Sequence, residues 1–261
     1  MKSNNKMKHR REKMLQLICE APVTTINELA EFFSVSTETI RKDIEFLEEQ
    51  DLVIRIHGGV APKERKSNET PFSTRSTHNL AQKQRIAQAA YHMIKPGDSI
   101  ILESGTTVQE LTKLLADDQE LLKSLVIITM SFRIMEILQE SSYSHVFFLG
   151  GRVRRDDFMT YGHYTISMLQ QFHVDKAFIG GAGINRELVL TDYFDEEIML
   201  RRQILASSDK TILLADSSKM DKTTIFSVCN LKDIYRLITD KDCPGEMTNL
   251  FDQNKISYRL V

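Results

Sequence analysis

Five short turns rich in glycine, serine and threonine follow apolar runs beyond residue 100, and one of them ends in a lysine. Turns of this kind leave backbone amides free to donate, and amides at the start of a helix attract anions. A phosphate group is the ligand that suits such chemistry. The five turns are Ser104-Gly105-Thr106-Thr107, Thr129-Met130-Ser131, Gly150-Gly151, Gly180-Gly181-Ala182-Gly183 and Asp216-Ser217-Ser218-Lys219.

The same residue types also form ordinary turns, so one such turn alone would not indicate a ligand. Five together favour an anion pocket. Thr107 and Glu110 have the spacing of a capping box, which predicts a helix start at the first turn. We predict that the pocket contains Glu103, Ser104, Gly105, Thr106, Thr107, Ser131, Gly150, Gly151 and Lys219.

These turns lie between strand-like and helix-like runs. Alternation of this kind predicts an α/β fold with a mostly parallel sheet covered by helices on both faces. In such sheets ligands bind at the carboxyl ends of the strands, where the five turns are expected. The predicted strands are 99–103, 125–130, 145–149, 175–180, 210–216 and 234–239, and the helical stretches include 80–94, 107–116, 131–140 and 192–208.

The first sixty residues have a different pattern, with three short amphipathic helices. The first covers residues 9–20, the second begins at a Thr25/Glu28 capping box, and the third follows Ser36 as its N-cap. Ile40, Ile44 and Leu47 share one face of the third helix, whose first turn is small and rich in hydroxyl groups. Such a helix suits insertion into a DNA major groove, although three short helices also occur in purely structural domains.

We predict a helix-turn-helix over about 25–44 and a small β wing after it. Two stretches rich in lysine and arginine, residues 1–13 and 61–85, flank this region and could contact phosphates. The predicted partner is double-stranded operator DNA. The predicted DNA contacts are Ser36, Thr37, Glu38, Thr39, Arg41, Lys42, Arg55 and His57.

The segment "SVSTETIRKDIEFLEEQDLVIRIHGG" resembles the DNA-binding region of DeoR-type bacterial repressors. That family has the pattern V-S-x-x-T-I-R-[RK]-D-L-x-x-L-E-x-x-G-x-[LI]-x-R-x-H-G-G in a winged helix-turn-helix. Two positions depart from it: Ile44 stands where leucine is usual, and Asp51 stands where glycine is usual. The resemblance implies a sequence-specific transcriptional repressor.

The resemblance continues with "ESGTT", "TMS", "GG", "DKAFIGGAGI" and "LLADSSK", in the order of the motifs of the family's C-terminal sensor domain. It implies a domain similar in fold to ribose-5-phosphate isomerase that binds a phosphorylated sugar effector, which would relieve repression of a carbohydrate-utilisation operon. Glu103 replaces the usual aspartate, and Met130 replaces the usual asparagine. These departures leave the identity of the sugar open.

An enzyme is the alternative function, since the implied fold is that of a sugar-phosphate isomerase. A carboxylate base beside the sugar would be needed, and candidates are Glu103, Asp175, Asp192, Asp195 and Glu196, with Lys219 as a donor. The stretch "FIGGAGI", where isomerases carry D-G-A-D-E, has no carboxylate. We therefore expect no catalytic residues, and we interpret 192–197 as an acidic helix start.

The chain of 261 residues is long enough for two domains. We expect a DNA-binding domain over 1–61, a linker over 62–78, and an effector-binding and oligomerisation domain over 79–261. No apolar run suits a membrane span, and no histidine or cysteine spacing suits a metal, so we expect a cytoplasmic protein without cofactor or metal. A single recognition helix reads a short half-site, which predicts a homo-oligomer, either a dimer or a tetramer.

Overall fold

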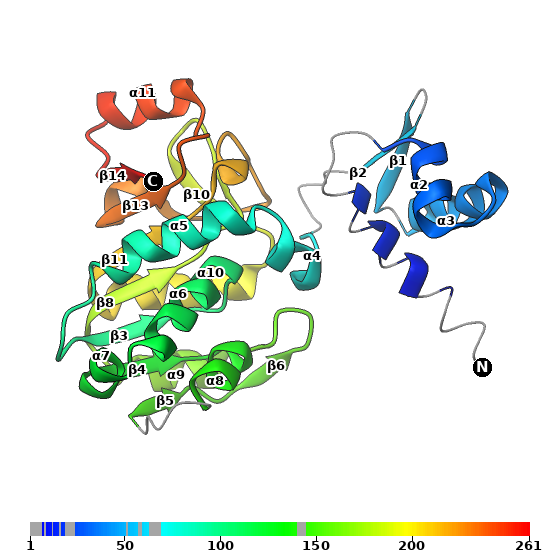
Figure 1. The fold of residues 1–261 in the computed structure, drawn as a ribbon. Helices are drawn as coiled ribbons and strands as arrows, with labels where there is room; N and C mark the ends of the chain where they lie inside the picture. Colours follow the sequence, from blue (N-terminus) through cyan, green and yellow to red (C-terminus); the bar gives the residue numbers. More distant parts are fainter. Residues whose placement is uncertain are drawn as a thin grey trace. The chain divides into compact units, whose positions relative to one another are not determined.

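The computed structural model describes residues 7, 9–11, 13–15, 17–18, 24–50, 52–56, 59–62, 69–139 and 145–261. The chain divides into two compact units, Met1–Arg65 and Lys66–Val261, and Figure 1 draws both. Within the described residues, no helix has both the length and the apolar character needed to cross a membrane.

The first unit is a winged helix-turn-helix, as predicted. It contains α2 (Ile26–Phe33), α3 (Thr37–Glu49) and the antiparallel strands β1 (Val53–Ile56) and β2 (Gly59–Pro62). The predicted capping box is present, because Thr25 Oγ1 accepts from the Glu28 amide and the Glu28 carboxylate accepts from the Thr25 amide. Ser36 caps α3 by accepting from the Thr39 amide.

An apolar core joins these elements to a helical stretch whose described residues are 9–11, 13–15 and 17–18. Asp43 of α3 is buried on the rim of this core, and the Arg10 and Arg11 Nε atoms donate to its two oxygens at 2.6 and 2.7 Å. A buried carboxylate is stable only when it is paired, so this contact fixes the first helical stretch against α3. The buried core residues are Met14, Leu15, Ile18, Leu29, Ile40, Ile44, Leu47, Val53 and Val60.

We expect Asp43→Ala to lower the free energy of unfolding of the first unit by about 1–3 kcal/mol, because it removes two charge-assisted hydrogen bonds. Urea unfolding followed by circular dichroism measures this loss. Glu45→Ala is the matched control, since Glu45 is an exposed carboxylate of the same helix. Equal stability of the two variants would show that Asp43 does not hold the unit together.

The second unit is built on a sheet of seven parallel strands, which confirms the predicted α/β class. Every strand predicted from the sequence is present, and β14 was not predicted. The order across the sheet is β14 (Tyr258–Leu260), β13 (Arg236–Thr239), β11 (Ser208–Leu214), β8 (Val174–Ile179), β3 (Ser99–Leu102), β4 (Val126–Thr129) and β5 (Val146–Phe148).

Helices cover both faces of this sheet because successive strand residues point to opposite sides. On β3, Ile100 packs with residues of α5 (Leu80–Tyr91), α6 (Thr106–Asp117) and α8 (Phe132–Gln139). The adjacent Ile101 packs with residues of α9 (His163–Leu169), α10 (Asp195–Ala206) and α11 (Gly245–Gln253).

The second unit also contains short elements that the sequence analysis did not predict. They are the hairpin β6 (Arg152–Arg154) and β7 (Met159–Tyr161), the small antiparallel sheet β9 (Gly183–Ile184), β10 (Val189–Asp192) and β12 (Phe226–Asn230), the helix α7 (Gln119–Ser124), and the 3-10 turns η1 (Ser217–Lys219) and η2 (Leu231–Asp233). Runs of two to six residues carry too little periodicity to predict an element from the sequence.

One helix lies inside the range predicted to be a linker, 62–78. Within its described part, α4 (Phe72–Thr77) buries Phe72 and Thr74 against the second unit. The composition suggested a linker because of Pro71 and the many hydroxyl residues, yet Pro71 is the N-cap of this helix. Residues 63–68 lie outside the described part of the chain.

Candidate functional site

The loop after β3 leads directly into α6 at the carboxyl edge of the sheet. Gly105 is the N-cap of α6 and offers no side-chain hydrogen bond to the first turn, while Thr106 and Thr107 are buried within that turn. The predicted capping box of Thr107 and Glu110 is wrong, because the N-cap is Gly105, two residues before Thr107. Glu110 instead accepts hydrogen bonds from Lys113 at 2.5 Å and Gln84 at 3.3 Å.

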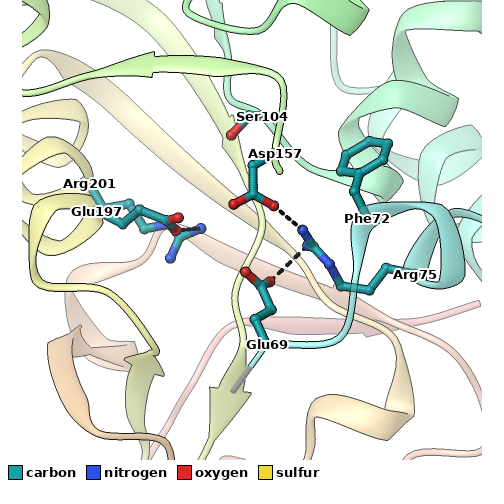
Figure 2. Close-up of a pocket in the computed structure, with 7 residues that line it drawn as sticks. All are labelled: Glu69, Phe72, Arg75, Ser104, Asp157, Glu197 and Arg201. Atoms are coloured by element: carbon teal, nitrogen blue, oxygen red, sulfur yellow. Dashed lines mark hydrogen bonds and ion pairs between the residues drawn. The ribbon is translucent and has the colours of Figure 1, made fainter. Parts of the chain in front are cut away.

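A polar pocket of about 20 Å³ opens beside Ser104 (Figure 2). Its walls come from the loop after β3, the β6–β7 turn, α10 and the segment containing α4. Both acidic and basic side chains line the pocket. The lining residues are Glu69, Phe72, Arg75, Ser104, Asp157, Glu197 and Arg201.

Arg201 of α10 forms the back of this pocket by pairing with three carboxylates. Its Nε atom lies 2.6 Å from Glu103 Oε1, and its other nitrogens pair with Asp192 of β10 and with Glu197. The second oxygen of Glu103 accepts from the Gly180 amide at 2.8 Å. Glu103 therefore lies behind Arg201 and links the ends of β3 and β8, rather than projecting into the pocket.

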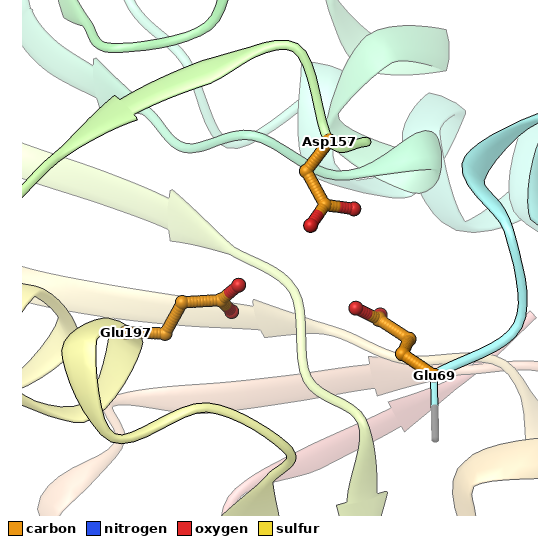
Figure 3. Close-up of side chains that lie close together, drawn as sticks. All are labelled: Glu69, Asp157 and Glu197. Atoms are coloured by element: carbon orange, nitrogen blue, oxygen red, sulfur yellow. The ribbon is translucent and has the colours of Figure 1, made fainter. Parts of the chain in front are cut away.

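Two further arginines, Arg75 and Arg154, form ion pairs with the carboxylates of the pocket. Arg75 pairs with Glu69 at 2.8 Å and donates to Asp157. Arg154 donates to Glu197 and lies 3.7 Å from Asp157. Carboxylate oxygens of Glu69, Asp157 and Glu197 all lie within 4.8 Å of one another (Figure 3), so these three are the described residues that could ligate a metal ion.

Carboxylates outnumber arginines in this network, and the pKa values respond accordingly. Burial raises the pKa of Glu197 well above its ordinary range, the nearby Glu69 carboxylate raises it further, and Arg154 opposes the rise. Burial also raises the pKa of Glu103, against the effect of Arg201. Burial is therefore the main cause that raises the pKa of both carboxyl groups, and the neighbouring arginines oppose it.

Ser131, Gly150 and Gly151 were also predicted for the pocket, but they are not among the residues that line it. Ser131 is buried and its hydroxyl accepts from the Ile134 amide in α8 at 3.4 Å. Gly150 accepts from the Thr165 hydroxyl, and a side chain on Gly151 would collide with Thr165 and lie 2.7 Å from the Tyr161 carbonyl oxygen. Gly151 thus lets α9 pack closely after β5.

Lys219 lies partly buried in η1, next to Asp216. Burial lowers the pKa of Lys219, while the Asp216 carboxylate acts in the opposite direction. Among the predicted effector residues, Ser104 is the one in the pocket lining. The sequence analysis did not identify Arg75, Asp157, Glu197 or Arg201 as site residues, and no local sequence pattern connects them.

In the first unit, α3 exposes the predicted DNA contacts. Thr37, Glu38, Arg41 and Lys42 are exposed, and no ion pair within the described residues involves the two cations. Arg55 on β1 lies 3.1 Å from Glu48, and both side chains are about half exposed. The predicted contact His57 falls outside the described residues.

A winged helix-turn-helix attached to a parallel α/β domain with a polar pocket defines a ligand-sensing DNA-binding regulator. The model of the DeoR-like helix-turn-helix domain matches residues 10–66, and the model of the DeoR C terminal sensor domain matches residues 78–241. The chain therefore belongs to the DeoR family of transcriptional regulators.

Two named transcriptional repressors match this chain over nearly their whole lengths. The HTH-type transcriptional repressor GlcR of Bacillus subtilis is 31% identical over 91% of this chain and 90% of its own length. The glycerol-3-phosphate regulon repressor of Escherichia coli is 26% identical over 98% of this chain and 99% of its own length. A solved ribose 5-phosphate isomerase A from Methanocaldococcus jannaschii covers 54% of this chain and 55% of its own, at 19% identity and a TM-score of 0.40.

We expect Glu197→Gln to raise the melting temperature at pH 8, with a smaller gain near pH 5. A carboxyl group whose folded pKa is raised keeps its proton while the unfolded chain releases one, so the free energy of unfolding falls as pH rises above about 4.5. Glutamine removes this loss. Glu196→Gln, at an exposed position beside Arg154, is the control. A variant less stable at pH 8 than at pH 5, relative to the parent, would contradict the expectation.

Proposed function

We propose that the protein represses a carbohydrate-utilisation operon and that a phosphorylated sugar relieves the repression. The observation that carries the effector part is the pocket beside Ser104, where the uncapped start of α6 adjoins Arg75 and Arg201. Arginines and helix-start amides suit a phosphate, and carboxylates suit sugar hydroxyls. The relative titled glycerol-3-phosphate regulon repressor is named for a small phosphorylated metabolite, which supports the same class of effector.

In this proposal Ser104, Gly105, Thr106 and Thr107 hold the phosphate, and Lys219 adds positive charge. Glu197 accepts hydrogen bonds from the hydroxyl groups of the sugar. Glu103 orients Arg201, while Ser131, Gly150 and Gly151 shape the neighbouring loops. Residues 79–261 then form the effector-binding domain, and α4 belongs with it.

We propose that α3 enters the major groove of operator DNA. Thr37, Glu38 and Thr39 face the groove, and Arg41 and Lys42 contact phosphates or base edges, with Ser36 at the helix start and Arg55 and His57 in the wing. Arg41→Ala should cost about 1–3 kcal/mol of specific binding. A salt-titrated mobility shift on an operator selected from random DNA measures this, with Lys232→Ala as a control that removes one exposed charge from the second unit. Unchanged specific binding by Arg41→Ala would refute the assignment.

We also propose that the protein acts as a cytoplasmic homo-oligomer, either a dimer or a tetramer, because useful specificity needs two recognition helices. Sedimentation of a monomer both free and on DNA would exclude this.

The alternative, an isomerase-like enzyme, lacks support from the arrangement of the candidate bases. Asp175 binds Ser99 at the opposite edge of the sheet, and Asp192 is paired with Arg201. Gly180–Gly183 contributes no carboxylate. We therefore propose that the domain catalyses nothing, and product formation seen by NMR from pentose or hexose phosphates would contradict this.

The effector is tested by thermal shift on the full chain with pentose phosphates, hexose phosphates and glycerol 3-phosphate, each beside its unphosphorylated form. A true effector at 100 times its Kd should add roughly 2.7 kcal/mol of stability, and should weaken operator binding by about 1–3 kcal/mol. Thr106→Val should weaken effector binding, whereas Thr248→Val on α11 should not. Stabilisation by unphosphorylated sugars alone would show that the phosphate assignment is wrong.

A further inference from the structure

The segment of residues 69–79, called here the strap, holds α4 and one wall of the pocket. In the sequence it follows directly after the boundary between the two units, which falls at Arg65 and Lys66. Glu69, Phe72 and Arg75 of the strap all line the pocket (Figure 2). The strap is therefore the part of the pocket wall that lies nearest in the sequence to the DNA-binding unit.

Arg75 holds the strap over the pocket through all three of its guanidinium nitrogens. Nε donates to the Thr70 carbonyl oxygen at 2.9 Å, one terminal nitrogen pairs with Glu69 at 2.8 Å, and the other donates to Asp157. Asp157 belongs to the β6–β7 turn, so this last contact joins the strap to the opposite wall, where Phe72 of the strap also packs edge-on against Phe158 with ring centroids 6.0 Å apart.

The end of the strap is anchored more firmly than its middle. The buried Lys83 ammonium on α5 donates to the carbonyl oxygens of Arg75 and His78, which are near the end of α4. Asn79 donates to Asp216 at 2.9 Å, beside η1. These contacts anchor the end of the strap, whereas the Arg75 side chain is held by ion pairs, hydrogen bonds and a cation–π contact with Phe72.

The small size of the pocket favours movement of one wall when a ligand enters. A cavity of about 20 Å³ has room for about one water molecule, far less than a sugar phosphate needs. Ser104 lies at the end of a core strand, and Glu197 and Arg201 lie on α10, which packs into the main core. The strap is attached by two buried side chains, Phe72 and Thr74, and by polar contacts, so it is the wall that yields first.

We propose that Arg75 binds the phosphate of the effector, giving up its carboxylate partners Glu69 and Asp157, and that the resulting shift of the strap carries the signal to the DNA-binding unit. This inference rests on the proposed binding of a phosphorylated sugar. An arginine grips a phosphate through two parallel hydrogen bonds, which makes the exchange of partners favourable. Asp157 keeps Arg154 as a neighbour after the exchange.

Substitutions of the two partners test the exchange because they act in opposite directions. Arg75→Met should weaken binding of the active sugar phosphate by roughly tenfold or more, since a charge-assisted pair is lost. Asp157→Asn should tighten binding by about threefold or more, because the phosphate no longer competes with a carboxylate for Arg75. Calorimetry with the sugar phosphates of the panel, and with inorganic phosphate, gives both numbers on the full chain.

Arg186 offers a matched control outside the pocket. It also bridges two carboxylates, Asp221 and Glu246, at 2.8 Å each. Arg186→Met and Asp221→Asn should leave sugar-phosphate affinity unchanged. Weaker binding by both Arg75→Met and Asp157→Asn would overturn the exchange, because it would assign the ion pair a purely structural role.

Movement of the strap is followed with a single tryptophan, since the natural chain has none. Phe72→Trp places the reporter in the pocket wall, and Tyr235→Trp places a control beside β13. Saturating sugar phosphate should change the emission of the first and leave the second unchanged. An unchanged Phe72→Trp emission, with operator DNA still released, would overturn the strap mechanism while leaving the proposed effector intact. If no phosphorylated sugar bound the parent chain, the proposed function and this inference would both fall.

Discussion

Arg201 is the side chain around which the carboxyl edge of the sensor domain is arranged. Its guanidinium group is buried and paired with Glu103 after β3, Asp192 of β10 and Glu197 of α10. A buried cation without partners would be very costly, so these three elements are held in one relative arrangement by the need to satisfy it. The pocket exists because this arrangement leaves a gap beside Ser104 that polar groups surround.

The excess of carboxylates around this cation is as important as the pairing itself. Glu69, Asp157 and Glu197 approach one another closely although three arginines lie among them. An anion that enters this network must therefore exchange an existing pairing for a contact of its own. A purely apolar cavity would bind less selectively and would offer no ion pair to rearrange.

The DNA-binding unit is also held together by a buried charge paired with residues of another element. Asp43 is buried in α3 and holds Arg10 and Arg11 of the preceding helical stretch. The opposite face of α3 keeps Arg41 and Lys42 exposed. One helix therefore supplies both the attachment to its own core and the surface offered to DNA, because residues three and four apart share a face.

The sequence by itself determined the two units, the helix-turn-helix, the parallel sheet and the family. Each of these depends on patterns of residues close together in the chain. Examples are the capping box at Thr25, the apolar face of Ile40, Ile44 and Leu47, and the alternation of apolar strands with helices. The sequence also predicted the turn at Ser104 to Thr107, because a strand that leads into a helix start is a local pattern.

Only the tertiary structure decided which charges surround the pocket. Arg75, Asp157 and Arg201 are more than forty residues apart in the chain, and nothing in their local sequence connects them. The short strands and α4, which bring them together, are stabilised by contacts with the rest of the domain rather than by their own periodicity. Pairing between distant charges is set by packing and desolvation, which exist only once the chain has folded.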